Sequence, residues 1–102
     1  MQTKQQSIGY ILRAFLDNGS NTSELLRIFL ELDKTIHDEG QTIGNNNTVN
    51  YLHYVMEYFR MGQERVTKVN SSLYNAFDIY TEEEAQEFCE RSVRTFRPRR
   101  RT

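Results

Sequence analysis

The feature that most constrains the fold is a row of apolar residues between Leu52 and Tyr80, spaced alternately three and four apart. Three and four residues each complete about one helical turn, so the row places one apolar seam along a helix. The row comprises Leu52, Val55, Phe59, Gly62, Val66, Val69, Leu73, Ala76 and Tyr80. It predicts a long helix over residues 48–80, capped by Thr48 or Asn47. Other helices, or a second copy of the chain, must cover its seam.

Two places inside this stretch are candidates for a break. Gly62 costs about 1 kcal/mol in a helix interior, and the run Asn70-Ser71-Ser72 offers side chains that compete for backbone hydrogen bonds. Two shorter helices are therefore the alternative. Because the apolar row keeps its phase across both places, we favour one helix, bent at most.

Apolar residues at helical spacing also predict three shorter helices, over residues 5–16, 21–39 and 81–96. Asn21 and Thr81 are each followed three residues later by a glutamate, which is the capping-box pattern of a helix start. Gly40 is expected to end the second helix, and Pro98 prevents the last from continuing. Residues 40–47 are rich in Gly and Asn and are expected to form a loop.

The predicted fold is all-α: a small four-helix bundle with a long third helix. Residues 1–97 form a single domain in this prediction, and residues 98–102 are a basic tail. Only 37% of the residues are hydrophobic, so we expect the chain to complete its burial by forming a homodimer. The expected interface lies on the seam of the third helix and comprises Leu52, Val55, Phe59, Val66, Val69 and Leu73.

Charge is strongly segregated along the chain. All 14 acidic residues lie in residues 1–90, with seven Lys and Arg, whereas the last twelve residues hold six Arg and no acid. These are Arg91, Arg94, Arg97, Arg99, Arg100 and Arg101. Guanidinium groups pair with phosphates, and a run of them releases counterions from nucleic acid. The six arginines are therefore the candidate nucleic-acid-binding residues.

Other chemistry has little support in the sequence. His37, His53 and Cys89 have no metal-ligand spacing, so we expect no metal site, and no catalytic or cofactor motif is present. We therefore expect no enzyme activity and no cofactor. The single cysteine and the lack of a signal peptide or a membrane-length apolar run favour a reducing, cytoplasmic location without membrane contact.

Two non-enzymatic hypotheses remain open, and an enzyme would require a pocket of titratable groups that no linear motif marks. The first is a small helical protein that binds the RNA or DNA backbone through its Arg-rich C-terminal helix and tail. The alternative is a protein-protein interaction module, such as an inhibitor, adaptor or assembly subunit of viral, plasmid or cellular origin. It would act through the helical seam or through the acidic face at residues 82–84. The arginines suit this alternative too, because positive charge stabilises a helix C-terminus and could dock on residues 82–84 of a neighbour.

Overall fold

The computed structural model describes residues 1–37 and 42–96, and these residues form an all-helical structure. Its helices are α1 (Lys4–Asp17), α2 (Thr22–Thr35), α3 (Asn45–Tyr58), α4 (Gln63–Ile79) and α5 (Glu82–Phe96). The predicted all-α class is confirmed, but the described part of the chain has five helices where four were predicted. Within that part, extended pairing is confined to one backbone bridge between Gln2 and Ile43.

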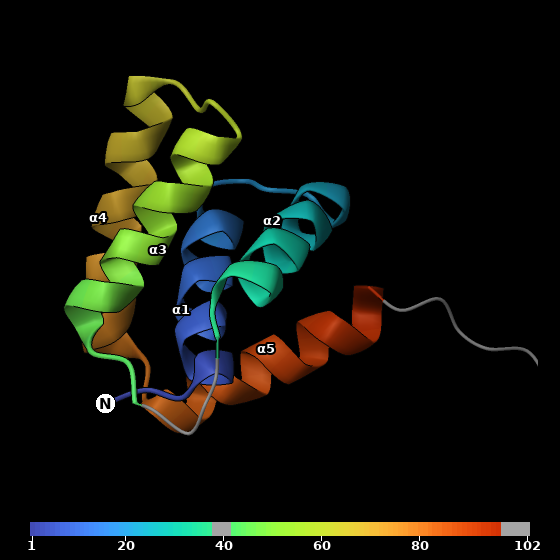
Figure 1. Cartoon of the computed structure of the whole chain (residues 1–102), viewed down its shortest axis with the longest axis vertical. Coiled ribbons are helices and arrows are strands. Elements are labelled where there is room, and N and C mark those ends of the chain that lie inside the picture. The colour runs from blue at the N-terminus through green and yellow to red at the C-terminus, as the bar shows by residue number, and fades with distance from the viewer. Residues whose placement is uncertain (38–41, 97–102) are drawn as a thin grey trace, which may run out of the picture.

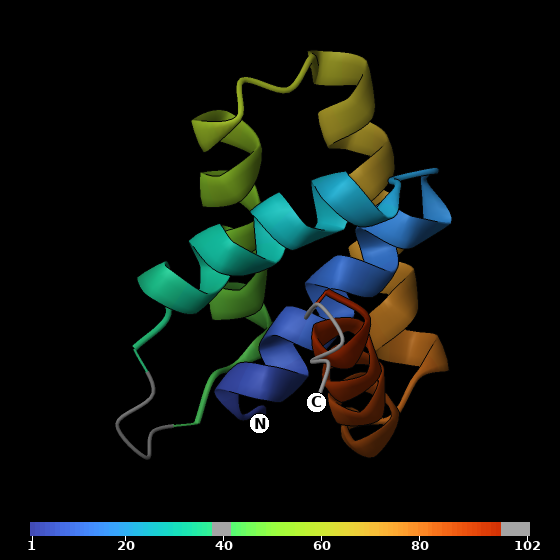
Figure 2. The same ribbon diagram turned by 90° about the vertical axis from the view of Figure 1, so that its right-hand side faces the viewer.

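Helix α1 lies in the middle of the molecule. The α3–α4 pair packs on one side of it, and α2 and α5 pack on the other (Figures 1 and 2). Most of its side chains between residues 7 and 15 are buried, and the fully covered apolar ones are Ile8, Ile11, Leu12, Ala14 and Phe15. Because every other helix contacts α1, its burial depends on the whole fold.

The predicted long helix over residues 48–80 is wrong, because the chain turns back between α3 and α4. Phe59 ends α3, Arg60 adopts a left-handed backbone with φ of 54°, and Gly62 precedes the first turn of α4. The two helices then run side by side in opposite directions (Figure 1). The alternative break at Asn70-Ser71-Ser72 does not occur, since these residues lie inside α4.

The turn explains why the apolar row kept its phase. Both helices direct their part of the row towards the same core, so a hairpin and a straight helix require the same spacing. Four of the six expected interface residues have no exposed surface, namely Leu52, Val55, Val69 and Leu73. Phe59 and Val66 are partly buried and pack against the core. The single chain thus fills most of its own seam, and of the six expected interface residues only Phe59 and Val66 keep exposed surface for a contact with a second chain.

Helix α2 ends at Thr35, four residues before the predicted end. The next residue, Ile36, leaves the helix with an extended backbone (φ −84°, ψ 114°) and is buried with 1% exposure. Turning this large apolar side chain into the core favours the early end. Gly40, the predicted stop, lies outside the described residues.

Helix α3 begins at Asn45, within the predicted loop, and its N-cap is Gly44 rather than Thr48 or Asn47. Thr48 instead lies inside the helix and is fully buried. Its hydroxyl donates to Gln2 Oε1 at 2.6 Å and lies 2.9 Å from Ser7 Oγ. A residue expected to cap a helix therefore links α3 to α1 and to the N-terminal segment.

Candidate functional site

Helix α5, which carries the candidate arginines, has a well-defined start. Thr81 Oγ1 accepts a hydrogen bond from the Glu84 amide at 3.1 Å, and the Thr81 amide donates to Glu84 Oε1 at 2.9 Å. This reciprocal pair is the predicted capping box. The first turn carries Glu82, Glu83 and Glu84, and the last turn carries Arg94. The helix dipole favours negative charge at the start of a helix and positive charge at its end.

One face of α5 packs on α1 and fixes its direction. Ala85 and Cys89 are 4% and 2% exposed, and Phe88 is partly buried beside them. Burial, with smaller contributions from Glu90 and Asp33, raises the pKa of the Cys89 thiol to about 11. Cys89 is therefore a buried neutral thiol and not an activated nucleophile.

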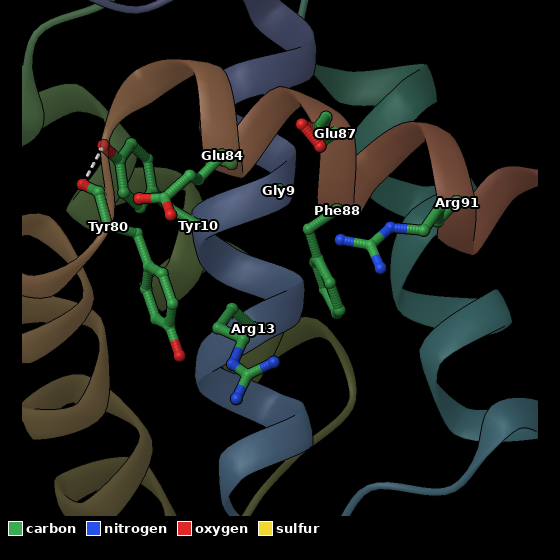
Figure 3. A pocket seen from close by; sticks show the side chains of 9 residues that line it. Gly9, Tyr10, Arg13, Tyr80, Glu84, Glu87, Phe88 and Arg91 are labelled. Atoms are coloured by element: carbon green, nitrogen blue, oxygen red, sulfur yellow. Dashed lines mark hydrogen bonds between the residues drawn. The ribbon is translucent and has the colours of Figure 1, made fainter.

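A cleft of about 200 Å³ lies between α1 and α5 on the side of the α4–α5 turn (Figure 3). Its central feature is Arg13, whose guanidinium carbon lies 5.1 Å from the ring centre of Tyr80 and 5.7 Å from that of Phe88. Arg91 extends from the next turn of α5 towards Phe88 (Figure 3). Two guanidinium groups and two aromatic rings thus meet at one place, an arrangement that suits nucleotides.

Carboxylates limit how strongly this cleft attracts anions. Glu84 and Glu87 line it together with Arg13 and Arg91, so its formal charge is balanced. Arg13 Nε also lies 3.1 Å from Asp17 Oδ1, although the geometry is not that of a hydrogen bond. The cleft therefore offers stacking surfaces more than it offers net positive charge.

Tyr10 ties the cleft to the backbone. Its hydroxyl donates to the Tyr80 carbonyl oxygen at 2.9 Å (Figure 3). Burial raises the pKa of Tyr10, and the negative charges of Glu82 and Glu84 raise it further. The phenol therefore stays protonated and serves as a fixed donor, and does not act as a base.

The structure describes two of the six candidate arginines, Arg91 and Arg94, and both are exposed on α5. Neither forms an ion pair with another described residue. They line different hollows: Arg91 borders the cleft with α1, and Arg94 borders a groove between α2 and α5. The other four candidates, Arg97, Arg99, Arg100 and Arg101, lie outside the described residues.

The groove between α2 and α5 has a volume of about 930 Å³ and an apolar wall. Leu26, Phe29 and Leu30 contribute from α2, and Val93 and Phe96 contribute from α5. Leu30 is 54% exposed and adds apolar surface at the edge of the groove. The rings of Phe29 and Phe96 lie 5.8 Å apart and join the two helices along it.

In residues 1–37 and 42–96, no three His, Cys, Asp or Glu side chains are grouped so as to hold a metal ion. In the same ranges, no helix has the length and apolar character needed to cross a bilayer. No protein-family model matches the chain, and neither the curated proteins nor the solved structures contain a match.

Sequence reasoning missed the contributions of Arg13, Tyr80 and Phe88 to the cleft. Arg13 is far from Tyr80 and Phe88 in the chain, and it meets them only because α5 crosses α1. No spacing along the sequence marks such a cluster.

Proposed function

We propose that this protein is a non-enzymatic nucleic-acid-binding domain that contacts backbone phosphates through the end of α5 and the arginines that follow it. The observation that carries this proposal is the availability of Arg91 and Arg94. Among the described Lys and Arg residues, five form ion pairs, namely Lys4, Arg13, Lys34, Arg65 and Lys68. A guanidinium without a carboxylate partner can donate its hydrogen bonds to phosphate oxygens.

The surroundings of these arginines support a contact focused on one end of the molecule. Glu87 and Glu90 precede Arg91 and Arg94 by one helical turn each, so this part of α5 has no net charge. The net positive charge follows it, in residues 97–101. Because the rest of the chain is acidic, a broad binding surface is disfavoured, and the contact depends on α5 and the arginines after it.

The proposal is tested by fluorescence anisotropy with labelled single-stranded RNA and DNA oligonucleotides at low salt. We expect binding by the intact chain and loss of most of it on removal of residues 97–102. Lys34→Gln, which removes one exposed and already paired cation on α2, is the matched control and should bind almost as the parent does. If the truncated chain binds as well as the intact one, the proposal is wrong.

A protein partner is the second candidate function, favoured by the groove between α2 and α5. Its apolar wall and the exposed Leu30 are typical of surfaces that bind an amphipathic helix. A second copy of the chain is one such partner, and we propose that any homodimer uses this groove, since most of the seam is already buried within one chain. Sedimentation equilibrium tests this: a dimer that Leu30→Glu converts to a monomer supports it, whereas a monomeric parent excludes the homodimer.

A further inference from the structure

A second set of arginines lies around the turn between α3 and α4, away from α5. Arg27 of α2, Arg60 of the turn and Arg65 of α4 line one hollow of about 300 Å³, which we call the turn hollow. Arg27 and Arg60 are exposed and form no ion pair with a described residue. Three arginines thus share one hollow, and only one of them is neutralised.

Arg65 is the neutralised member, and it is held in place. Its Nη1 donates to Glu24 Oε2 at 2.7 Å and its Nη2 donates to Glu24 Oε1 and, at 2.9 Å, to Ser20 Oγ. This bidentate pair joins α4 to the start of α2. Glu24 is the one acidic residue lining the turn hollow, and Arg65 balances the charge of Glu24. The positive charges of Arg27 and Arg60 are therefore not neutralised within the hollow.

The backbone of the turn also favours an anion. Gly62 borders the turn hollow and precedes α4, whose first turn receives no side-chain cap. Amide N–H groups at a helix start carry partial positive charge and add to the field of the arginines. The backbone of Arg60 adopts the left-handed conformation, which costs a residue with a side chain about 1–2 kcal/mol relative to Gly.

We propose that Arg27 and Arg60 bind a phosphate group in the turn hollow, with the anchored Arg65 as its wall. Two unpaired guanidinium groups offer parallel donors to several oxygens of one anion, which phosphate presents and a single carboxylate does not. The phosphate comes either from a free phosphate compound or from a nucleic-acid backbone. The site lies on α2 and the α3–α4 turn, and it does not rest on the binding proposed for α5.

The test is a titration of isotope-labelled protein by NMR, with inorganic phosphate as one probe and a short single-stranded oligonucleotide as the other. Ionic strength is held constant with chloride. We expect saturable shifts of the Met61 and Gly62 amides with at least one probe. Saturation by inorganic phosphate assigns a free phosphate source, and saturation by the oligonucleotide alone assigns a backbone phosphate.

Two variants identify the residues responsible. Arg60→Asn removes the charge and keeps a residue that tolerates the left-handed turn, and Arg27→Gln acts on a separate helix. Each should weaken binding at least about tenfold, because each removes charge-assisted hydrogen bonds. Lys68→Gln, which removes a cation of α4 that does not line the turn hollow, should change binding little.

The proposal is overturned if neither probe shifts these amides saturably, or if both arginine variants bind as the parent does. Unchanged circular dichroism spectra and melting temperatures confirm that the variants fold. Should Arg60→Asn fail to fold, Arg27→Gln decides the question alone. Loss of oligonucleotide binding on removal of residues 97–102, with these shifts retained in phosphate, would separate this site from that of α5.

Discussion

Gly9 of α1 lies directly against Ala85 of α5: a Cβ atom placed on Gly9 would be 1.9 Å from the Ala85 carbonyl oxygen. This distance is far below any real contact between a carbon and a backbone oxygen, so only a glycine permits the observed crossing of the two helices. The crossing brings Phe88 and Arg91 beside Arg13. The shape of the cleft in Figure 3 therefore depends on a residue that lacks a side chain.

Replacing this glycine should separate the two helices. We expect Gly9→Ala to lower the free energy of unfolding by about 2 kcal/mol or more, although Ala is favoured over Gly within a helix by about 1 kcal/mol. Urea unfolding followed by far-UV circular dichroism measures the change. Gln5→Ala on the exposed side of α1 is the control and should stay within about 0.5 kcal/mol of the parent.

The ion pair between Glu24 and Arg65 should make stability depend on pH. The hydrogen bonds from Arg65 lower the pKa of Glu24 to about 2, and burial opposes this shift. Because the pKa is lower in the folded chain, the pair stabilises the fold above the unfolded pKa of about 4.3. This stabilisation is lost as the pH falls from there to about 2.

Glu24→Gln tests this dependence. The variant should be less stable than the parent by about 1–2 kcal/mol near neutral pH, because it loses charge-assisted hydrogen bonds at a partly exposed site. The difference should shrink steadily below about pH 4. Urea unfolding at several pH values provides the measurement, with the exposed Glu57→Gln as control. A difference that stays constant across this range would contradict the assignment.

Cys89 should be unreactive in the folded chain. Cys89 is 2% exposed and the pKa of its thiol is raised to about 11. Little thiolate is therefore present near pH 8, and a thiol reagent in solution cannot reach the sulfur. A colorimetric disulfide reagent should modify it at least about a hundredfold more slowly than a free thiol. In concentrated guanidinium chloride, the one cysteine of each chain should react fully. Rapid reaction of the folded chain would show that α5 detaches readily from α1.

The N-cap of α3 offers a stabilising change. Gly44 has an extended backbone (φ −80°, ψ 165°), makes no side-chain cap and has open space where a Cβ would lie. Gly44→Ser supplies a hydroxyl that can accept from a first-turn amide and should raise stability by about 0.3–1 kcal/mol. Gly44→Ala supplies the Cβ atom without the hydroxyl and should not raise stability. The melting temperatures of both variants, compared with that of the parent, provide the measurement.

Local signals in the sequence predicted the starts of α2 and α5, whereas tertiary packing decided most of the features that were missed. Thr81 forms the expected capping box, because a cap involves only neighbouring residues. Asn21 forms only the N-cap half of its expected box, because the Glu24 carboxylate pairs with Arg65. The break near Gly62 was considered but not favoured, because a hairpin and a straight helix share one apolar spacing. The end of α2 depends on the burial of Ile36 against distant residues, which no local pattern reports.

The same distinction applies to the candidate site. The charge segregation of the sequence singled out Arg91 and Arg94, and both are exposed as a binding role requires. Arg13, which lines the cleft together with Arg91, could not be predicted, because it comes from the other end of the chain. Arg27 and Arg60 were missed for a similar reason, since the turn that brings Arg60 near α2 was only the less favoured alternative.

The salt dependence of oligonucleotide binding tests the proposed function most directly. For single strands, the logarithm of the binding constant falls against the logarithm of the salt concentration with a slope of about −0.7 per neutralised phosphate. Six arginines therefore predict a slope of about −4, and Arg91→Gln with Arg94→Gln should reduce its magnitude by about 1.4. An unchanged slope in the double variant, or no binding at about 50 mM salt, would contradict the account.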